Sequence, residues 1–126
     1  MDSRLDVGIV GAGPVGVALA KAISDAGHLV QAIATTDPDR AEQVSLLLPG
    51  VRVGDVASTV KGVDLVIFAI PGNQIYDLVQ GLAETQVLVQ GQFFVSTSPD
   101  YGYEVFEPAY PVRILPMALH PAMKFT

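Results

Sequence analysis

Cysteine is absent from this chain of 126 residues. Its absence excludes disulfide bridges, thiolate metal sites and a cysteine nucleophile. Basic residues are scarce as well, with 7 Lys and Arg against 13 Asp and Glu. The net charge of −6 argues against a nucleic-acid-binding function, because such proteins need a basic face to neutralise phosphates. A bound phosphate group must therefore be held by local backbone donors and not by the overall field of the protein.

Long apolar runs and a secretory leader are also missing. The apolar stretch at 65–70 is far shorter than the roughly 20 residues of a membrane-spanning helix. Asp2, Arg4 and Asp6 interrupt the N-terminus before any apolar run, unlike the start of a signal peptide. We therefore expect a cytoplasmic protein with no membrane partner. The carboxylates are scattered without the spacing of metal ligands, so we also expect no metal site.

The composition is that of one compact domain, which we place at residues 1–126. Half of the residues are hydrophobic and 16% are charged, which is enough apolar material for a substantial core. The mean hydropathy of +0.43 is high for a chain of this size. Because monomers rarely expose large apolar patches, part of this surface is expected to meet a partner, either a second copy in a homodimer or a further domain.

Apolar stretches of strand length alternate along the chain with segments of helical period. The expected strands are 5–10, 29–34, 51–53, 65–70, 93–95 and 112–115. This alternation favours an α/β fold of three layers, the Rossmann type, with a doubly wound and mainly parallel sheet. The expected strand order is 3-2-1-4-5-6.

The segments between the strands carry helix signals. Asp37 precedes Pro38 as an N-cap, Asn73 is the expected cap of a later helix, and 101–106 is the expected site of a short last helix. The apolar residues expected to face the sheet are Leu19, Ala22, Ile23, Ala26, Val44, Leu47, Leu48, Ile75, Leu78, Val79 and Leu82.

The strongest functional signal lies between the first strand and the first helix. The run is Gly11, Ala12, Gly13, Pro14, Val15 and Gly16. In a dinucleotide-binding turn the first glycine permits the tight turn, the second lets the backbone approach a pyrophosphate, and the third lets the helix pack closely. The alternative is a structural glycine turn that binds no nucleotide. The strand before the motif, the helix after it and the next strand at the right distance favour the binding function.

The end of the second strand bears on the choice between NAD and NADP. Sites for NAD commonly carry Asp or Glu there to hold the ribose hydroxyls, whereas this chain reads Ala34, Thr35, Thr36, Asp37. Thr35 and Thr36 can donate hydrogen bonds, and Arg40 can reach a 2′-phosphate from the next helix. The alternative is that Asp37 only caps the helix while Arg40 is solvated. NADP is slightly favoured over NAD.

Four segments resemble one family of proteins: 7–16, 26–28, 68–71 and the Ala-Leu-His-Pro-Ala-Met run at 118–123. The chain resembles the Rossmann-like N-terminal domain of the DUF2520-containing family, which is similar to pyrroline-5-carboxylate reductase, prephenate dehydrogenase and 6-phosphogluconate-dehydrogenase-like proteins. The resemblance implies an NAD(P)-dependent oxidoreductase whose C-terminal helical domain is missing from this chain. Two departures are Ala34 and Thr36, where the family tends to have Ser and Arg, and Ser96-Thr97-Ser98-Pro99, where it tends to have a His-Thr-Ser-Gly-like run.

Further candidate residues follow the later strands, because ligands of open α/β sheets lie beyond the carboxyl ends of the strands. They are Ala69, Ile70 and Pro71 after the fourth strand, Thr97 and Ser98 after the fifth, and His120 after the sixth. His120 is the one residue in this row suited to proton exchange near neutral pH. Its alternative role is to fix the loop by hydrogen bonding. A similar His-Pro pair is catalytic in prephenate and arogenate dehydrogenases. His28, after the first helix, is interpreted as structural.

Taken together, these features predict the NAD(P)-binding domain of an oxidoreductase that transfers hydride to or from a small metabolite. Two alternatives stay open: a non-catalytic nucleotide-binding sensor or subunit, and a domain that has lost its ligand and keeps a protein-interaction role. Because the cofactor carries the chemistry and no second domain closes the cleft, the isolated chain is expected to bind cofactor but to turn over poorly or not at all. The substrate cannot be read from the sequence.

Overall fold

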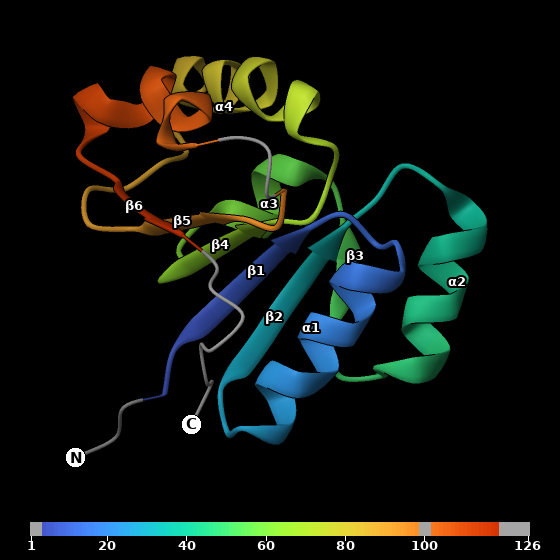
Figure 1. Ribbon diagram of the computed structural model, residues 1–126. Coiled ribbons are helices and arrows are strands. Elements are labelled where there is room, and N and C mark those ends of the chain that lie inside the picture. Colours follow the sequence, from blue (N-terminus) through green and yellow to red (C-terminus); the bar gives the residue numbers. More distant parts are fainter. Residues whose placement is uncertain (1–3, 99–101, 119–126) are drawn as a thin grey trace.

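A parallel sheet of six strands forms the centre of the fold (Figure 1). The computed structural model describes residues 4–98 and 102–118. The strands are β1 (Asp6–Val10), β2 (Leu29–Ala34), β3 (Arg52–Gly54), β4 (Leu65–Phe68), β5 (Phe93–Ser96) and β6 (Leu115–Ala118). Their order is β3-β2-β1-β4-β5-β6 and every pairing is parallel, so the predicted fold class and strand order are confirmed.

Helices cover both faces of this sheet and complete the three layers. They are α1 (Pro14–Asp25), α2 (Pro38–Leu47), α3 (Val56–Val60), α4 (Ile75–Glu84) and the 3₁₀ segments η1 (Gly72–Gln74) and η2 (Tyr103–Val112). Figure 1 shows α1 and α2 on one side of the sheet and α3 and α4 on the other. Because both faces are covered, the central strands are apolar throughout, and all four residues of β4 are buried.

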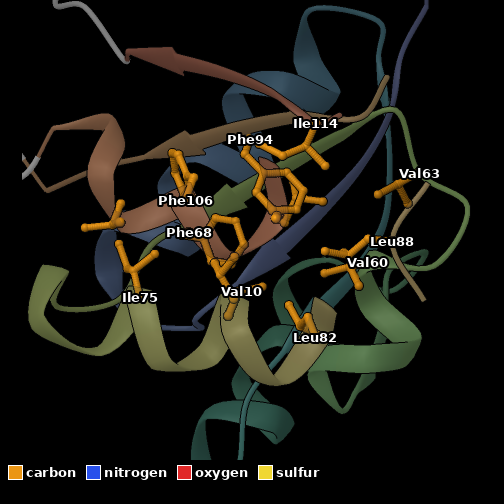
Figure 2. Packing of buried hydrophobic residues seen from close by; sticks show 14 residues of the cluster. Val10, Val60, Val63, Phe68, Ile75, Leu82, Leu88, Phe94, Phe106 and Ile114 are labelled. Atoms are coloured by element: carbon orange, nitrogen blue, oxygen red, sulfur yellow. The ribbon is translucent and has the colours of Figure 1, made fainter. Parts of the chain in front are cut away.

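The two faces have different cores. On the side of α3, α4 and η2, three rings from β4, β5 and η2 pack together: Phe68, Phe94 and Phe106 (Figure 2). Their centroids lie 5.2 to 5.5 Å apart in edge-on and tilted arrangements, which suit the quadrupoles of the rings. The side of α1 and α2 is lined by aliphatic and small residues, including Ile9, Ile33 and Ala20.

Glycine lets α3 approach the sheet closely. A Cβ built on Gly8, in the middle of β1, would overlap the carbonyl oxygen of Thr59 in α3. Thr59 is fully buried, and its hydroxyl donates to the carbonyl of Asp55 at 2.7 Å, so the polar group is satisfied inside the helix. No motif in the sequence predicts this contact of Gly8.

Two helix starts follow the predicted chemistry. Asp37 is the N-cap of α2 and accepts from the N–H of Asp39 at 2.9 Å, with Pro38 at the first position. Asp55 caps α3 in the same way, accepting from the N–H of Ser58 at 2.8 Å. His28 is structural as expected, because its Nδ1 accepts from the N–H of Leu5 at 3.0 Å.

The end of the described chain differs from the prediction. The helix expected at 101–106 is a longer 3₁₀ segment, Tyr103–Val112, and the strand expected at 112–115 is Leu115–Ala118. Pro108 and Pro111 lie inside η2. Proline lacks the N–H of an α-helix and clashes with the preceding turn, so short 3₁₀ turns replace the helix and delay the strand.

Three finer predictions were wrong. Asn73 does not cap α4; it lies within η1, which begins after Pro71, and Gln74 precedes α4 without a side-chain cap. Ala22 is exposed on α1, where the buried positions are Gly16, Ala20 and Ile23. The Leu47 side chain is 66% exposed. α2 buries Val44 alone, and its last turn lies toward solvent.

Candidate functional site

The turn after β1 has a backbone that requires its first glycine. Gly11 has a φ of +113°, a region that L side chains rarely adopt. A Cβ at this position would also overlap the carbonyl oxygen of Ala69, just beyond β4. The Gly11 N–H donates to the carbonyl of Ala34 at 2.9 Å, so the turn is attached to the end of β2. The turn is therefore fixed between its two neighbouring strands.

The other two glycines of the turn differ in the space around them. A Cβ at Gly16 would overlap the carbonyl oxygen of Gly11, so glycine is needed for α1 to begin against the turn. Gly13 has an ordinary φ of −72°, and the nearest atom to a Cβ there would be Nη1 of Arg40 at 3.7 Å. The fold itself thus does not require glycine at position 13, and the open space in front of its backbone can admit a ligand.

The first turn of α1 presents its backbone donors to this space. Gly13 is the N-cap and makes no side-chain cap hydrogen bond, Pro14 occupies the first position, and the first turn carries no acidic residue. The first N–H groups of a helix have no partner within the helix and lie at the positive end of its dipole. Val15, in the same turn, is 55% exposed. This arrangement can hold an anion through backbone N–H groups.

A cleft of about 360 Å³ lies beside the glycine turn at the carboxyl ends of β1, β2, β3 and β4. It is lined by Val10, Gly11, Ala34, Thr35, Thr36, Asp55, Val56, Ile70, Gln74 and Leu78. The lining is mainly apolar, with polar groups at a few points, which is the usual character of a small-molecule site. Of the residues singled out in the sequence, four line this cleft: Gly11, Thr35, Thr36 and Ile70.

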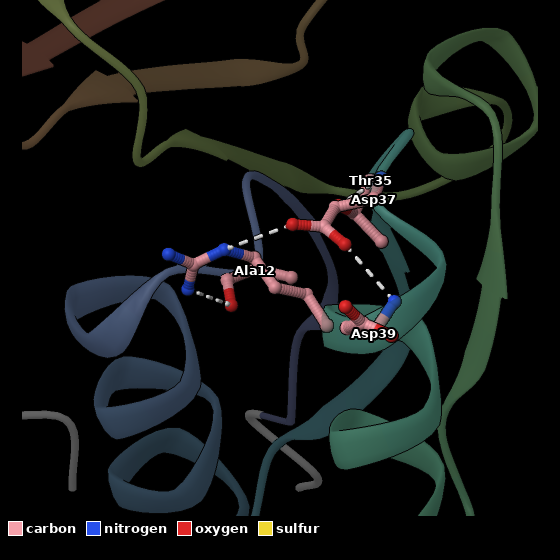
Figure 3. A network of polar contacts seen from close by, with 5 residues as sticks. Ala12, Thr35, Asp37 and Asp39 are labelled. Atoms are coloured by element: carbon pink, nitrogen blue, oxygen red, sulfur yellow. Dashed lines mark hydrogen bonds and ion pairs between the residues drawn. The ribbon is translucent and has the colours of Figure 1, made fainter.

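A small polar network joins the loop after β2 to the glycine turn (Figure 3). Nη1 of Arg40 donates to the carbonyl of Ala12 at 3.4 Å, and its Nε lies 3.7 Å from a carboxylate oxygen of Asp37. Oγ1 of Thr35 accepts from the N–H of Asp37 at 3.1 Å. Asp37 therefore caps α2, and Arg40 lies against the glycine turn while its side chain stays 44% exposed.

The candidate residues after β4 and β5 lie along the same edge of the sheet. The Ala69 N–H donates to the carbonyl of Val10 at 2.8 Å, and Pro71 is exposed at the start of η1. The Thr97 N–H donates to the carbonyl of Phe68 at 3.1 Å, and the Ser98 N–H donates to Oγ of Ser96 at 3.0 Å. His120 lies outside the described residues.

Asp55, Val56, Gln74 and Leu78 line the cleft but were not predicted as site residues. Of these residues, Asp55 is the one that the sequence could have indicated. Its position directly after β3 was the missed signal, because the carboxyl-end rule applies to that strand as well. The pKa of Asp55 is lowered from 3.8, first by hydrogen bonds from the N–H and hydroxyl of Ser58 and then by the charge of Arg52.

In residues 4–98 and 102–118, no group of three or more His, Asp or Glu side chains is placed to hold a metal ion. Nor does this part of the chain contain a helix of the length and apolarity that crossing a membrane requires.

The model of the Rossmann-like domain family matches residues 1–121. Among curated proteins, the chain is similar to glycerol-3-phosphate dehydrogenase (NAD(P)+) of Azotobacter vinelandii, with 28% identity over 111 residues. This alignment covers 78% of the chain but 32% of the relative, so the chain spans about a third of that enzyme's length. The match to the family model extends over the strands, the glycine turn and the cleft.

Solved structures share the fold at low sequence identity. A proposed NADP oxidoreductase from Bacteroides fragilis superimposes with a TM-score of 0.77 at 17% identity, over 97% of this chain and 46% of that one. An imine reductase from Pseudomonas sp. gives a TM-score of 0.69 at 18% identity, over 92% of this chain and 41% of that one. At such identities the similarity establishes the fold, and the chain spans less than half of either protein.

Proposed function

Since the chain belongs to the Rossmann-like domain family, we propose that it is the NAD(P)-binding domain of an oxidoreductase that transfers hydride to or from a small metabolite. The observation that carries the proposal concerns Gly13. The fold has room for a Cβ at this position, and yet the residue is glycine. Gly11 and Gly16 are required by the fold, whereas Gly13 is explained by a ligand that approaches the backbone.

The residues present fit a dinucleotide along the whole carboxyl edge. The backbone at Gly13 and the first turn of α1 would hold the pyrophosphate, aided by the helix dipole. The cleft would receive the adenosine half, with Thr35 and Thr36 near the ribose. Ala69, Pro71, Thr97 and Ser98 would border the nicotinamide half, on the other side of the glycine turn, whereas Ile70 lines the cleft of the adenosine half. A bound nicotinamide supplies the hydride chemistry, while these residues orient it and exclude water.

The cofactor we propose is NADP in preference to NAD. β2 ends at Ala34 with no carboxylate to hold the ribose hydroxyls, and Arg40 lies against the glycine turn within reach of the same loop. A guanidinium forms strong charge-assisted bonds to phosphate, and Arg40 is exposed enough to turn toward one. The proton-transfer role proposed for His120 rests on the sequence alone.

The substrate would be held by polypeptide other than the described domain, either a further domain or a second copy of the chain. The length of the relatives, about two to three times that of this chain, supports this division of roles. The cofactor carries the reaction, and the described residues hold and orient it.

Thermal-shift titration with NADPH, NADH and ATP tests the proposal. A ligand that binds only the folded state adds about 2.7 kcal/mol of stability at a hundred times its dissociation constant. We expect a clear upward shift in melting temperature with NADPH, a smaller one with NADH and none with ATP. A chain that melts cooperatively and shifts with neither dinucleotide would contradict the proposed function.

Arg40→Gln tests the preference for NADP. The variant removes one charge-assisted contact to the 2′-phosphate, so NADPH should bind about tenfold more weakly while NADH binding stays nearly constant. The matched control is Lys21→Gln, which removes the same charge from an exposed position on α1 whose ion pair with Asp25 lies at the surface. Equal losses for both dinucleotides, or for both variants, would contradict a specific contact to the 2′-phosphate.

A further inference from the structure

The cleft beside the glycine turn has apolar walls drawn from three different elements. Val56 comes from α3, Ile70 from the segment after β4, and Leu78 from α4. Ile70 and Leu78 are half-buried against the core, so their positions are fixed by packing. Walls of this kind suit a flat aromatic ring, which gains from contact with aliphatic surfaces on both sides.

The polar groups of the cleft are few and differ in what they can recognise. Oγ1 of Thr35 already accepts a backbone N–H, and Thr36 lies next to it in the loop after β2. Gln74 carries an amide that both donates and accepts, so it does not distinguish a donor from an acceptor on a ligand. Asp55 is the one ionisable residue of the lining, and as a carboxylate it only accepts hydrogen bonds.

The carboxylate of Asp55 is held in a defined orientation. Its Oδ1 accepts from the N–H of Ser58 at 2.8 Å as the N-cap of α3. Arg52 is anchored in the same turn through a hydrogen bond from Nη2 to the carbonyl of Ser58 at 2.8 Å. These contacts also keep the pKa of the carboxyl below its ordinary value, so the group is an anion at neutral pH.

We propose that Asp55 is a base-specificity residue, which accepts a hydrogen bond from the exocyclic amino group of adenine in this cleft. The inference rests on the proposed function. Because Oδ1 accepts the hydrogen bond of the N-cap, Oδ2 is the oxygen that would accept from the base. Adenine presents a donor at its 6-position, whereas hypoxanthine and guanine present a carbonyl oxygen that a carboxylate repels. The chain therefore selects adenine dinucleotides over their 6-oxo analogues.

The experiment compares each of NADPH and NADH with its nicotinamide hypoxanthine analogue by isothermal titration calorimetry on the full chain. The wild type should bind the adenine form about tenfold more tightly, since one charge-assisted hydrogen bond is replaced by repulsion. Asp55→Asn keeps the cap, because asparagine and aspartate are equally good N-caps. Its Oδ1 must still accept from Ser58, which leaves the amide nitrogen in the place of Oδ2. This donor faces the base, so the preference should disappear or invert.

Asp25→Asn is the control for the change in charge, since it lies at the far end of α1 from the glycine turn. It should retain the wild-type preference. Equal wild-type binding of both forms would overturn the role of Asp55 while leaving the proposed function intact. An unchanged preference in Asp55→Asn would do the same. If neither form binds, the proposed function fails and the inference fails with it.

Discussion

The amino ends and the carboxyl ends of the parallel strands, here called the amino edge and the carboxyl edge of the sheet, are held together in different ways. At the amino edge, side chains bridge residues far apart in sequence. His28 accepts from the N–H of Leu5, 23 residues away, and Asp64 accepts from the N–H of Asp6, 58 residues away. Gln92 is 4% exposed and donates to the carbonyls of Val60 and Val63 at 2.8 and 3.0 Å.

At the carboxyl edge most side-chain hydrogen bonds stay within one loop. Thr35 binds the N–H of Asp37 and Ser96 binds that of Ser98, each two residues along, while Asp55 binds that of Ser58, three residues along. The exceptions are Arg40 to the Ala12 carbonyl and Thr97 to the Phe68 carbonyl, both at 3.4 Å and therefore weak. This edge shapes each loop separately and leaves the space between loops open.

The contacts that stabilise the fold are thus separated in space from the edge at which binding is proposed. Throughout the described ranges, each buried side-chain nitrogen or oxygen has a hydrogen-bond partner, so the folded chain needs no ligand to satisfy its interior. The amino edge carries long-range contacts that the fold depends on, whereas the carboxyl edge offers backbone donors and a cleft. Substitutions at the two edges should therefore affect different measurements.

The largest effect is expected from Gln92→Leu at the amino edge. Leucine is similar in volume but leaves the carbonyls of Val60 and Val63 and the N–H of Val89 without this partner. At about 1–3 kcal/mol for an unsatisfied buried group, the free energy of unfolding should fall by about 3 kcal/mol. Urea denaturation measures the loss, and Gln80→Leu, on the exposed side of α4, is the control. A loss no greater than that of the control would show that this edge does not hold the fold.

Gly13→Ala is the corresponding change at the carboxyl edge. The fold accepts the new Cβ, since its nearest neighbour is a mobile Arg40 nitrogen at 3.7 Å, and the poorer cap costs at most about 1 kcal/mol. The Cβ would occupy the space of the pyrophosphate, so dinucleotide affinity should fall about tenfold, a change of about 1.4 kcal/mol. Calorimetric titration measures it. Gly50→Ala, also at an open position, should bind as the wild type does. Unchanged affinity in Gly13→Ala would show that the glycine turn is not part of the binding site.

Gly81→Ala lies at neither edge and is expected to raise the stability of the fold, in contrast to the two preceding variants. Gly81 lies in α4, is exposed, and has open space where a Cβ would be. Alanine in a helix interior is more favourable than glycine by about 0.5–1 kcal/mol, so the unfolding free energy should rise by that amount. Dinucleotide affinity should not change. A decrease in stability would mean that the apparent open space is occupied in the protein in solution.

The smallest effect concerns pH and the carboxyl edge. Because the pKa of Asp55 is lowered in the folded state, its charge stabilises the fold fully above the unfolded value of 3.8. That contribution is lost as the pH falls through the lower folded-state pKa. The difference in unfolding free energy between wild type and Asp55→Asn should therefore be constant above about pH 5 and shrink below pH 3.8. Acid titration of both proteins by circular dichroism measures it, and a difference that grows on acidification would contradict the sign.

The sequence predicted the elements that depend on local chemistry. The unbroken apolar run of β4, the start of α2 at Pro38 after its Asp37 cap and the tight turn at Gly11 each have a direct physical cause, and these predictions are confirmed. Some of the predictions that failed depended on neighbours in space. Leu47 has the right helical spacing, but α2 buries only Val44 and leaves Leu47 66% exposed.

The part of the site that was missed has the same origin. Leu78 enters the cleft only because α4 lies at the same edge of the sheet as the loops after β2 and β3, and no residue spacing in the sequence encodes this juxtaposition. Asp55 is the exception, because it directly follows β3. Gln92 likewise resembles any polar loop residue until its carbonyl partners, 32 and 29 residues away, are known. Cofactor choice, by contrast, depends on a few residues after β2 that the sequence does present together.

The all-parallel pairing has a consequence for how fast the chain folds. Every pairing among the described strands joins segments separated by a helix or a long connection, so each must close a large loop before it gains any contact. The loop closed by the central pair, β1 with β4, contains the whole of β2 and β3. High contact order of this kind slows folding, typically to milliseconds or seconds. The geometry that gathers four strand ends around one cleft thus makes the nascent chain slow to bury its apolar strands.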